Sequence, residues 1–194
     1  MNHLKPRPPG WTCHLFTLKG LESILMQKKG APGYQRGDEP EDLARHKLHA
    51  DHQGNPHIPR EMFWAALAAQ AAGRVLPDGR IVTIKPKDDT RNKKYVRLRH
   101  LLHLSGQGLQ LNCNGWRADI RQGYDSKKSA KCGIVRPSIE LPWTASGHIC
   151  LAPDVEEFVT ELINDAGSLQ GFGSYRAEKD GYHGTFELEE FRPV

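Results

Sequence analysis

Four histidines fall within one short polar stretch, and an imidazole can bind a metal ion or transfer a proton. His46, His49 and His52 are spaced three residues apart, so on a helix they would cluster loosely on one face and could bind a metal. With His57, they could also supply a general base. The His pair with a glutamate that marks zinc hydrolases is missing, as is any linear Ser-His-Asp or Cys-His arrangement. We therefore predict an exposed polar segment with no catalytic residue, no metal and no cofactor.

A glycine-punctuated segment near the C-terminal end has the residue types that hold a sugar-phosphate chain. Glycine adopts positive φ angles and lets a ligand approach the backbone, whose N–H groups can then cradle phosphate. Tyrosine rings can stack on bases, and a guanidinium can pair with phosphate. The predicted contacts are Gly171, Gly173, Tyr175, Arg176, Gly181, Tyr182 and Gly184. A tight hairpin that serves only chain geometry is the alternative interpretation.

Positive charge is concentrated in two stretches of the chain. The first comprises Lys85, Lys87, Arg91, Lys93, Lys94, Arg97 and Arg99. The second comprises Arg117, Arg121, Lys127, Lys128 and Lys131 and continues to Arg136, with Trp116 beside it as the predicted stacking residue. Residues 154–194 carry ten acidic and three basic side chains, so the net charge of +4 conceals −7 there and +11 before it. Segregated positive charge suggests a polyanionic partner, although charge runs are usually solvated faces.

The length of 194 residues suits a single domain with a hydrophobic core, and we treat 1–194 as one unit. No apolar run approaches the ~20 residues that span a bilayer, and the basic, proline-rich start leads into no signal-peptide core. A cytoplasmic location is therefore expected. Cys13, Cys113, Cys132 and Cys150 form no C-x-x-C pair, so we expect thiols rather than a zinc site or a disulfide framework.

Two helices and a series of short strands must position these groups. Helices are predicted at 59–72, with proline in the first turn, and at 153–166, with acidic residues in the first turn. Strands are predicted at 11–18, 75–84 about an Asp-Gly turn, 95–104, 109–112, 132–141, 143–151 and 185–191. Residues 28–58 are interpreted as a protruding loop or finger with a short helix over 39–49. This order indicates an α+β fold, in which an antiparallel sheet carries both helices on one face, plus a long excursion after the first strand.

Two motifs at the ends of this order resemble the RAMP superfamily, the RRM-like modules from which CRISPR effector complexes are built. Residues 55–67, with the sequence NPHIPREMFWAAL, are similar to the opening of the first helix in the backbone-subunit branch, x-x-I-P-G-S-S-h-x-G-A-L-R. Ile58-Pro59 and Ala66-Leu67 match this pattern, whereas Arg60-Glu61-Met62 stands in place of Gly-Ser-Ser.

The second motif, over 169–186, resembles the glycine-rich loop that follows the second helix in RAMP proteins, h-G-x-G-x-x-x-x-x-G-h-G-x-h. Small proteins of phages and prophages end in a similar way, with G-h-G-D-[FY]-R-P before a further G-x-[FY]-G-x-F. Here Ser174 and Ala177 replace their Asp and Pro. The resemblance covers residues 11–84 and 132–194, and strand order alone covers the middle.

The resemblance implies a ferredoxin-like or RRM-like fold and a non-catalytic subunit that binds guide RNA. Such a subunit would repeat along the strand beside other effector subunits, with single-stranded DNA as the alternative ligand and no membrane. Two further functions stay open. Some RAMP proteins process guide RNA with a histidine near the first helix, and backbone subunits of RNA-targeting complexes use an Asp after the first strand, where Asp38, Asp42 and Asp51 lie here. The second open function is that of a phage protein that acts through contacts with other proteins.

Overall fold

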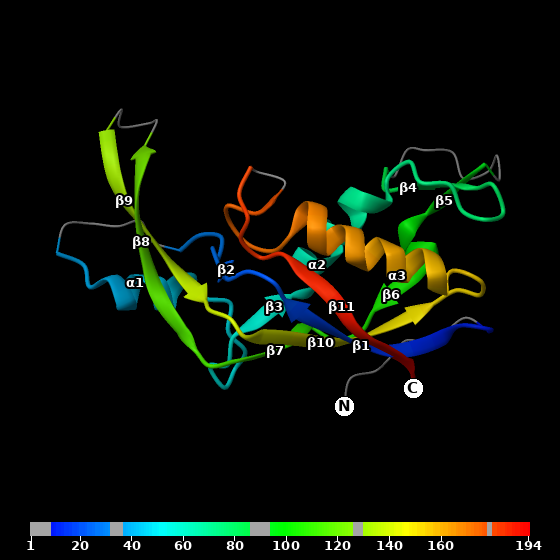
Figure 1. Cartoon of the computed structure of the whole chain (residues 1–194), viewed down its shortest axis with the longest axis horizontal. Helices are drawn as coiled ribbons and strands as arrows, with labels where there is room; N and C mark the ends of the chain where they lie inside the picture. The colour runs from blue at the N-terminus through cyan, green and yellow to red at the C-terminus, as the bar shows by residue number, and fades with distance from the viewer. Residues whose placement is uncertain (1–8, 32–36, 86–93, 126–129, 178–179) are drawn as a thin grey trace.

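A six-stranded antiparallel sheet is the base of the molecule (Figure 1), in a computed structural model that describes residues 9–31, 37–85, 94–125, 130–177 and 180–194. Its strand order is β11-β1-β10-β7-β3, and β6 also pairs with β10. The strands are β1 (Thr12–Gly20), β3 (His57–Pro59), β6 (Leu102–Leu104), β7 (Gly108–Cys113), β10 (Trp143–Leu151) and β11 (Phe186–Pro193). Each neighbouring pair in this sheet is antiparallel, as the sequence predicted.

Two helices cover one face of this sheet (Figure 1), and both follow the predicted pattern. α2 (Arg60–Ala71) begins directly after Pro59. α3 (Glu156–Asp165) carries acidic residues in its first turn and passes into a π-helical turn, η3 (Ala166–Gln170). The α+β, RRM-like fold class is thereby confirmed.

Aromatic rings join the helices, the sheet and the C-terminal segment in one core. Phe63 of α2 stacks on Phe16 of β1, with ring centroids 5.2 Å apart. The edge of Phe63 meets Phe172, which in turn stacks on Phe186 at 4.4 Å. Since all four rings are buried, Phe172 fixes the start of the glycine segment against the core.

A second sheet of three strands projects from the first. β8 (Trp116–Asp125) and β9 (Ala130–Ile139) pair along their length as a ribbon, and β2 (Ile24–Leu25) adds to β9. The sequence analysis predicted no strand between 112 and 132, whereas Trp116 begins β8. Apolar and charged side chains alternate from Trp116 to Arg121 in the first half of β8, which is a strand pattern that the prediction missed.

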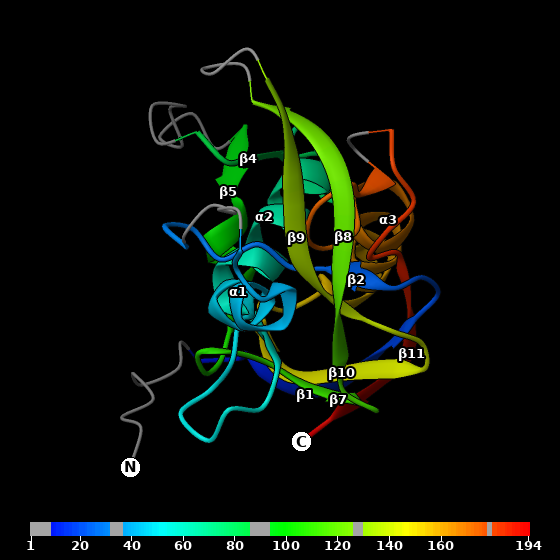
Figure 2. The same ribbon diagram turned by 90° about the vertical axis from the view of Figure 1, so that its left-hand side faces the viewer.

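The predicted excursion is partly docked on this ribbon. Its helix, α1 (Pro40–Lys47), places Leu43 and Ala44 against Val135 of β9 in a small separate core. The buried ammonium of Lys47 donates a hydrogen bond to the carbonyl of Val135 at 2.7 Å. The ribbon and the helix α1 of the predicted excursion therefore lie together at the end that projects from the main sheet (Figures 1 and 2).

A short parallel pair, β4 (Ile81–Thr83) and β5 (Tyr95–Arg97), lies at the opposite end of the long axis (Figure 1). The predicted Asp-Gly turn precedes β4, and Val75 bridges Ile81 across it. A single strand over 95–104 is wrong, because a 3-10 turn, η2 (Leu98–His100), separates β5 from β6. That turn breaks the alternation, so His100 and His103 are both exposed.

Cys13 and Cys150 form a disulfide, contrary to the expectation of free thiols. They lie directly opposite each other in the β1–β10 register, with their Cα atoms 4.0 Å apart. Their separation of 137 residues hides this pairing from the sequence. Cys113 keeps a free thiol, and the side chain of Cys132 is outside the described part. Among the described residues, no helix has the length and apolar character to cross a membrane.

Candidate nucleic-acid interface

The β8–β9 ribbon has two faces of different chemistry, because successive side chains of a strand point to opposite sides. One face carries Trp116, Ala118 and Val135, which contribute to the small core on α1. The other face is polar and comprises Arg117, Asp119, Arg121, Arg136 and Ser138. This polar face meets the C-terminal glycine segment (Figure 2), so part of the second basic stretch and that segment come together in space.

Tyr175 lies at the centre of this contact. The guanidinium carbon of Arg121 is 5.2 Å from the Tyr175 ring centroid, and that of Arg136 is 4.9 Å from it. Both distances are within the range of cation–π attraction. Tyr175 is still 38% exposed, so its ring remains partly open to a ligand. We refer to Arg121, Arg136 and Tyr175 as the ribbon–loop cluster.

Arg121 is held in one orientation by its neighbours. Its Nε donates to Oδ1 of Asp119 at 2.6 Å, and its Nη2 lies 2.9 Å from Nε2 of His183. Burial, and secondarily the charge of Arg121, lowers the pKa of His183, which favours a neutral ring that accepts this hydrogen bond. The hydrogen bond to Asp119 raises the pKa of Arg121 above its ordinary value. The guanidinium is thus charged and pre-oriented.

The cluster carries more positive than negative charge. Among the described residues, Asp119 is the carboxylate paired with Arg121, and it lies opposite Arg136 in the β8–β9 register. The Nε of Arg136 is buried and has no hydrogen-bond partner in the described part of the chain. Arg117, on the same face, pairs with Glu140 at 2.9 Å and stays largely exposed. An anion that reaches Tyr175 would meet oriented arginines, whose planar forks match phosphate oxygens.

The glycine segment uses much of its backbone within the protein. The N–H groups of Gly171, Gly181 and Gly184 donate to Ala166, Arg176 and Ser23 carbonyls at 2.9, 3.2 and 2.8 Å. Ser174 pairs with Leu25 of β2, and the Nη1 of Arg176 donates to the carbonyl of Gly173 at 2.9 Å. The three glycine N–H groups are therefore occupied, and the segment turns the rings of Tyr175 and Tyr182 outward instead, the latter 62% exposed.

The first basic stretch is not brought to this cluster. It surrounds β5 at the opposite end of the long axis (Figure 1), where Lys85, Lys94 and Arg99 are exposed and Arg97 is half-buried. Lys94 lies with its Nζ 5.8 Å from the Tyr95 ring. Lys87, Arg91, Lys93, Lys127 and Lys128 are outside the described residues, as is the side chain of Lys131 in β9.

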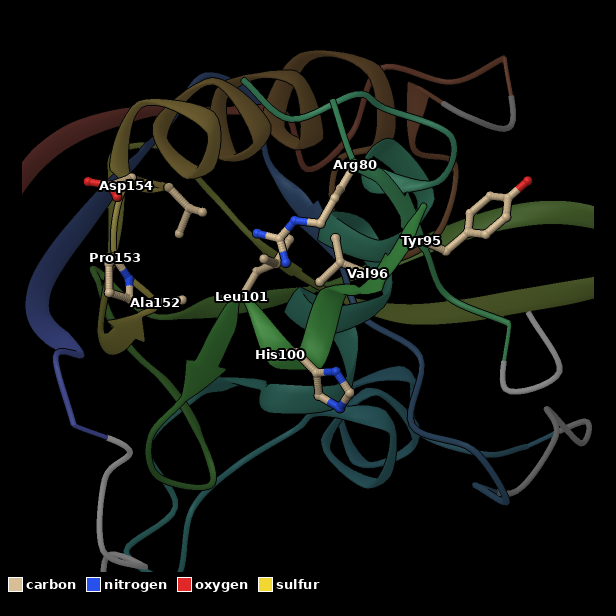
Figure 3. Close-up of a pocket in the computed structure, with 9 residues that line it drawn as sticks. Arg80, Tyr95, Val96, His100, Leu101, Ala152, Pro153 and Asp154 are labelled. Carbon is tan, nitrogen blue, oxygen red and sulfur yellow. The ribbon is translucent and has the colours of Figure 1, made fainter. Parts of the chain in front are cut away.

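A cavity of about 690 Å³ opens at this β5 end (Figure 3). Val96, Leu101 and Val155 give it an apolar lining, and Arg80 extends toward it from the turn before β4. The Nε of Arg80 donates to Oδ2 of Asp78 at 2.5 Å. His100 lies at one side of the cavity and lines it together with Arg80, although the two residues are 20 positions apart in the sequence.

Comparison with known proteins identifies this architecture. No family model matches the sequence, and no curated protein is similar to it. A chain from the cryo-EM structure of the type III-B Cmr-beta bound to cognate target RNA superposes with a TM-score of 0.61. This chain has the fold of that Cmr-beta chain. The two are 13% identical, and the match covers 95% of this chain and 61% of the Cmr-beta chain.

A chain of a type IV-B CRISPR complex also aligns, with a TM-score of 0.49 and 11% identity, over 93% of this chain and 90% of the other. Because this chain spans less than two thirds of the Cmr-beta chain, that larger protein has a part without a counterpart here. At 13% identity, the likeness to the Cmr-beta chain establishes the shared fold.

The histidine-rich stretch does not form the arrangement considered from its spacing. α1 ends at Lys47, so His46, His49 and His52 do not share one helix. Instead His49 approaches His57, with ring centroids 6.3 Å apart. Within the described ranges, no group of three or more His, Cys, Asp or Glu side chains could hold a metal ion. Asp51 accepts hydrogen bonds from the N–H groups of Gln53 and Asn55, which lower the pKa of its carboxyl and indicate a role in turn geometry.

The sequence analysis did not name Asp119, Arg136 or His183 as members of the interface. Arg136 was counted with the second basic stretch but not among the ligands, and His183 was overlooked inside the glycine motif. The alternation of Arg117, Asp119 and Arg121 was the available signal, because it places three charged side chains on one face of a strand.

Proposed function

We propose that this chain is a non-catalytic subunit of a CRISPR-type effector ribonucleoprotein. In this proposal it binds single-stranded RNA through the ribbon–loop cluster. The single observation that carries this proposal is the pair of guanidinium groups on Arg121 and Arg136, 5.2 and 4.9 Å from the exposed ring of Tyr175. Arginine forks pair with phosphate, and an aromatic ring stacks on a base. RNA binding of this type depends on charge and stacking rather than on base sequence.

The fold supports the same proposal. It is shared with a chain of a Cmr-beta complex that was solved with cognate target RNA. An RRM-like sheet with added loops is a frequent frame for single-stranded RNA. Two motifs of the sequence, at 55–67 and 169–186, resemble RAMP proteins independently of this superposition.

We propose that copies of the chain lie along the RNA beside other effector subunits, in the cytoplasm. The net charge of −7 over 154–194 supports such an assembly, because β11 and α3 contribute exposed carboxylates that can face basic side chains of a neighbour. RNA is preferred to single-stranded DNA on the strength of the shared fold.

The test is a binding titration of the full chain against a 20-nucleotide unstructured RNA at several salt concentrations, with the matching DNA alongside. We expect log K to fall linearly with log salt, by about 0.7 per phosphate contact. Arg136→Gln should weaken binding about tenfold, since a charge-assisted contact is lost. No binding of RNA or DNA at low salt would overturn the proposal and favour a protein that acts through protein contacts.

Arg45→Gln is the matched control for this titration. The guanidinium of Arg45 also lies over an aromatic ring of the ribbon, 5.8 Å from Trp116, but it is on the α1 face. Its removal should change RNA affinity less than twofold. Equal losses for the Arg45 and Arg136 variants would show that bulk charge, rather than the cluster, binds the strand.

A guide-processing endoribonuclease is the second candidate, and the contact between His49 and His57 favours it. Burial, and for His49 also the neighbouring His57, lowers the pKa of both rings, which keeps them neutral and able to accept a proton from a 2′-hydroxyl. Incubation of the chain with repeat RNA in EDTA tests this function. Cleavage that is lost in His49→Gln and His57→Gln would establish the endoribonuclease. RNA that stays intact with the wild type would support the non-catalytic subunit.

A further inference from the structure

Two cavities adjoin each other at the N-terminal end of α2. The first, of about 480 Å³, is lined by Lys28, His49 and His57 among others. The second, of about 400 Å³, is lined by Trp64, Arg99 and His103 among others. Both include Arg60 and Glu61 in their walls, so the two cavities adjoin at these side chains, at the start of the helix. We refer to the two cavities together as the groove.

The groove is positively charged along its length. Lys28, Arg60 and Arg99 supply three cations, whereas Glu61 is the one carboxylate among its described lining residues. Glu61 is itself largely exposed and lies 3.6 Å from a guanidinium nitrogen of Arg60, so it offsets a single charge. Three imidazoles and the indole of Trp64 are interspersed with these cations.

The position of the groove matters more than its size. At one end, the N–H of Lys28 donates to the carbonyl of Lys47 at 3.0 Å, and Lys47 ends the helix that docks on the ribbon. At the other end, Arg99 is followed by His100, which lines the cavity beside β5. The groove therefore lies between the segment that leads to the ribbon and the residues that lead to the cavity beside β5.

We infer that this groove is a second contact surface for single-stranded RNA, on which Lys28, Arg60 and Arg99 bind phosphates and Trp64 stacks on a base. The inference rests on the proposed function and extends it from a local cluster to a path across the molecule. A polynucleotide fits better than an acidic peptide, because rings alternate with cations here as bases alternate with phosphates. An acidic peptide would be bound by the cations and would leave the aromatic rings without a role.

Charge removal in the groove tests the inference in the full chain. Arg60→Ala and Lys28→Ala should each weaken binding of a 20-nucleotide RNA about tenfold and lower the salt slope by about 0.7. Both side chains are exposed, and the backbone N–H of Arg60 that donates to Gln107 is kept in the alanine variant, so folding is preserved. Arg192→Ala is the matched control, since Arg192 is an exposed arginine that pairs with a nearby glutamate, Glu190, on β11.

The possible results separate the groove from the proposed function. Losses in the two groove variants, with unchanged affinity in Arg192→Ala, support the inference. If the wild type binds RNA and all three variants bind it equally well, the inference about the groove is wrong. The ribbon–loop cluster then remains the proposed RNA contact. A wild type that binds no RNA overturns both.

Crosslinking provides an independent measurement. RNA with 4-thiouridine, irradiated on the wild type and digested with trypsin, should label the peptide 61–74, which contains Trp64. Labels confined to peptides of β8, β9 and 169–186 would contradict the groove. Displacement of the RNA by a lower concentration of poly-glutamate than of unlabelled RNA of the same length would assign the groove to an acidic protein instead.

Discussion

The ribbon–loop cluster and the β5 end of the molecule contain similar residues but differ in how these residues are held. Each has a tyrosine beside a cation, Tyr175 with Arg121 and Arg136, and Tyr95 with Lys94. In the cluster, Asp119 and His183 orient Arg121 by hydrogen bonds. At the β5 end, Lys94 is an exposed side chain whose Nζ is 5.8 Å from the ring.

The difference shows that a count of basic residues does not locate a binding site. A lysine on a flexible stem loses side-chain entropy when it binds, whereas an arginine already fixed by a carboxylate loses little. Two stretches of equal charge can therefore differ in affinity for the same phosphate. The following predictions set the two regions against each other.

The largest effect is expected from the glycines that shape the two regions. Gly184 has φ 74°, and a Cβ there would lie 2.1 Å from the carbonyl oxygen of Phe172. Gly79, in the turn before β4, has φ 82° with open space around it. Gly184→Ala should lower the free energy of unfolding by ~3 kcal/mol or more through backbone strain and a steric clash, and Gly79→Ala by ~1–2 kcal/mol through strain alone. Urea denaturation measures both, and equal losses would mean that the glycine segment is loosely packed.

The second prediction compares the two tyrosines as ligands. Tyr175→Leu should weaken RNA binding about tenfold, because stacking on one base contributes ~1–3 kcal/mol. Tyr95→Leu should weaken it less than threefold, since its cation is not pre-oriented. The titration described for Arg136→Gln measures both variants. A larger loss for Tyr95 would move the primary contact to the β5 end.

The sequence predicted the parts of this comparison that depend on local pattern. The helical spacing of apolar residues identified α2 and α3, and the glycine spacing identified the segment after α3. The meeting of Arg136 with Tyr175 and the disulfide between Cys13 and Cys150 depend on strand register between distant segments. β8 was missed for a different reason, because the alternation of apolar and charged side chains over 116–121 is a local strand pattern that the prediction overlooked.

A third prediction concerns the histidine beside the ribbon–loop cluster, His183, and the two histidines of the groove, His49 and His57. Burial lowers the pKa of His183, His49 and His57 in the folded protein below the unfolded value of ~6.5. Below pH ~6.5 the unfolded chain thus binds more protons than the folded chain, and the free energy of unfolding falls as the pH falls. Urea midpoints at pH 7.5, 6.5 and 5.5 should decrease in that order. His183→Gln should reduce this decrease, and an unchanged pH profile would exclude His183 as a contributor.

The smallest effect is expected for Arg45, which lies on the α1 face of the ribbon, where apolar side chains are buried. Leu43 and Ala44 of α1 pack on Val135 there, and exposed Arg45 lies over Trp116 at 5.8 Å. A cation–π contact at an exposed site contributes ~0.5–1 kcal/mol, so Arg45→Gln should lower the free energy of unfolding by no more than that. Leu43→Ala should lower it by ~2–3 kcal/mol, because a buried aliphatic side chain is removed. A larger loss for Arg45→Gln than for Leu43→Ala would mean that charge holds the ribbon to α1. The two faces of the ribbon would then both depend on charge, and the reason for assigning RNA to one of them would be lost.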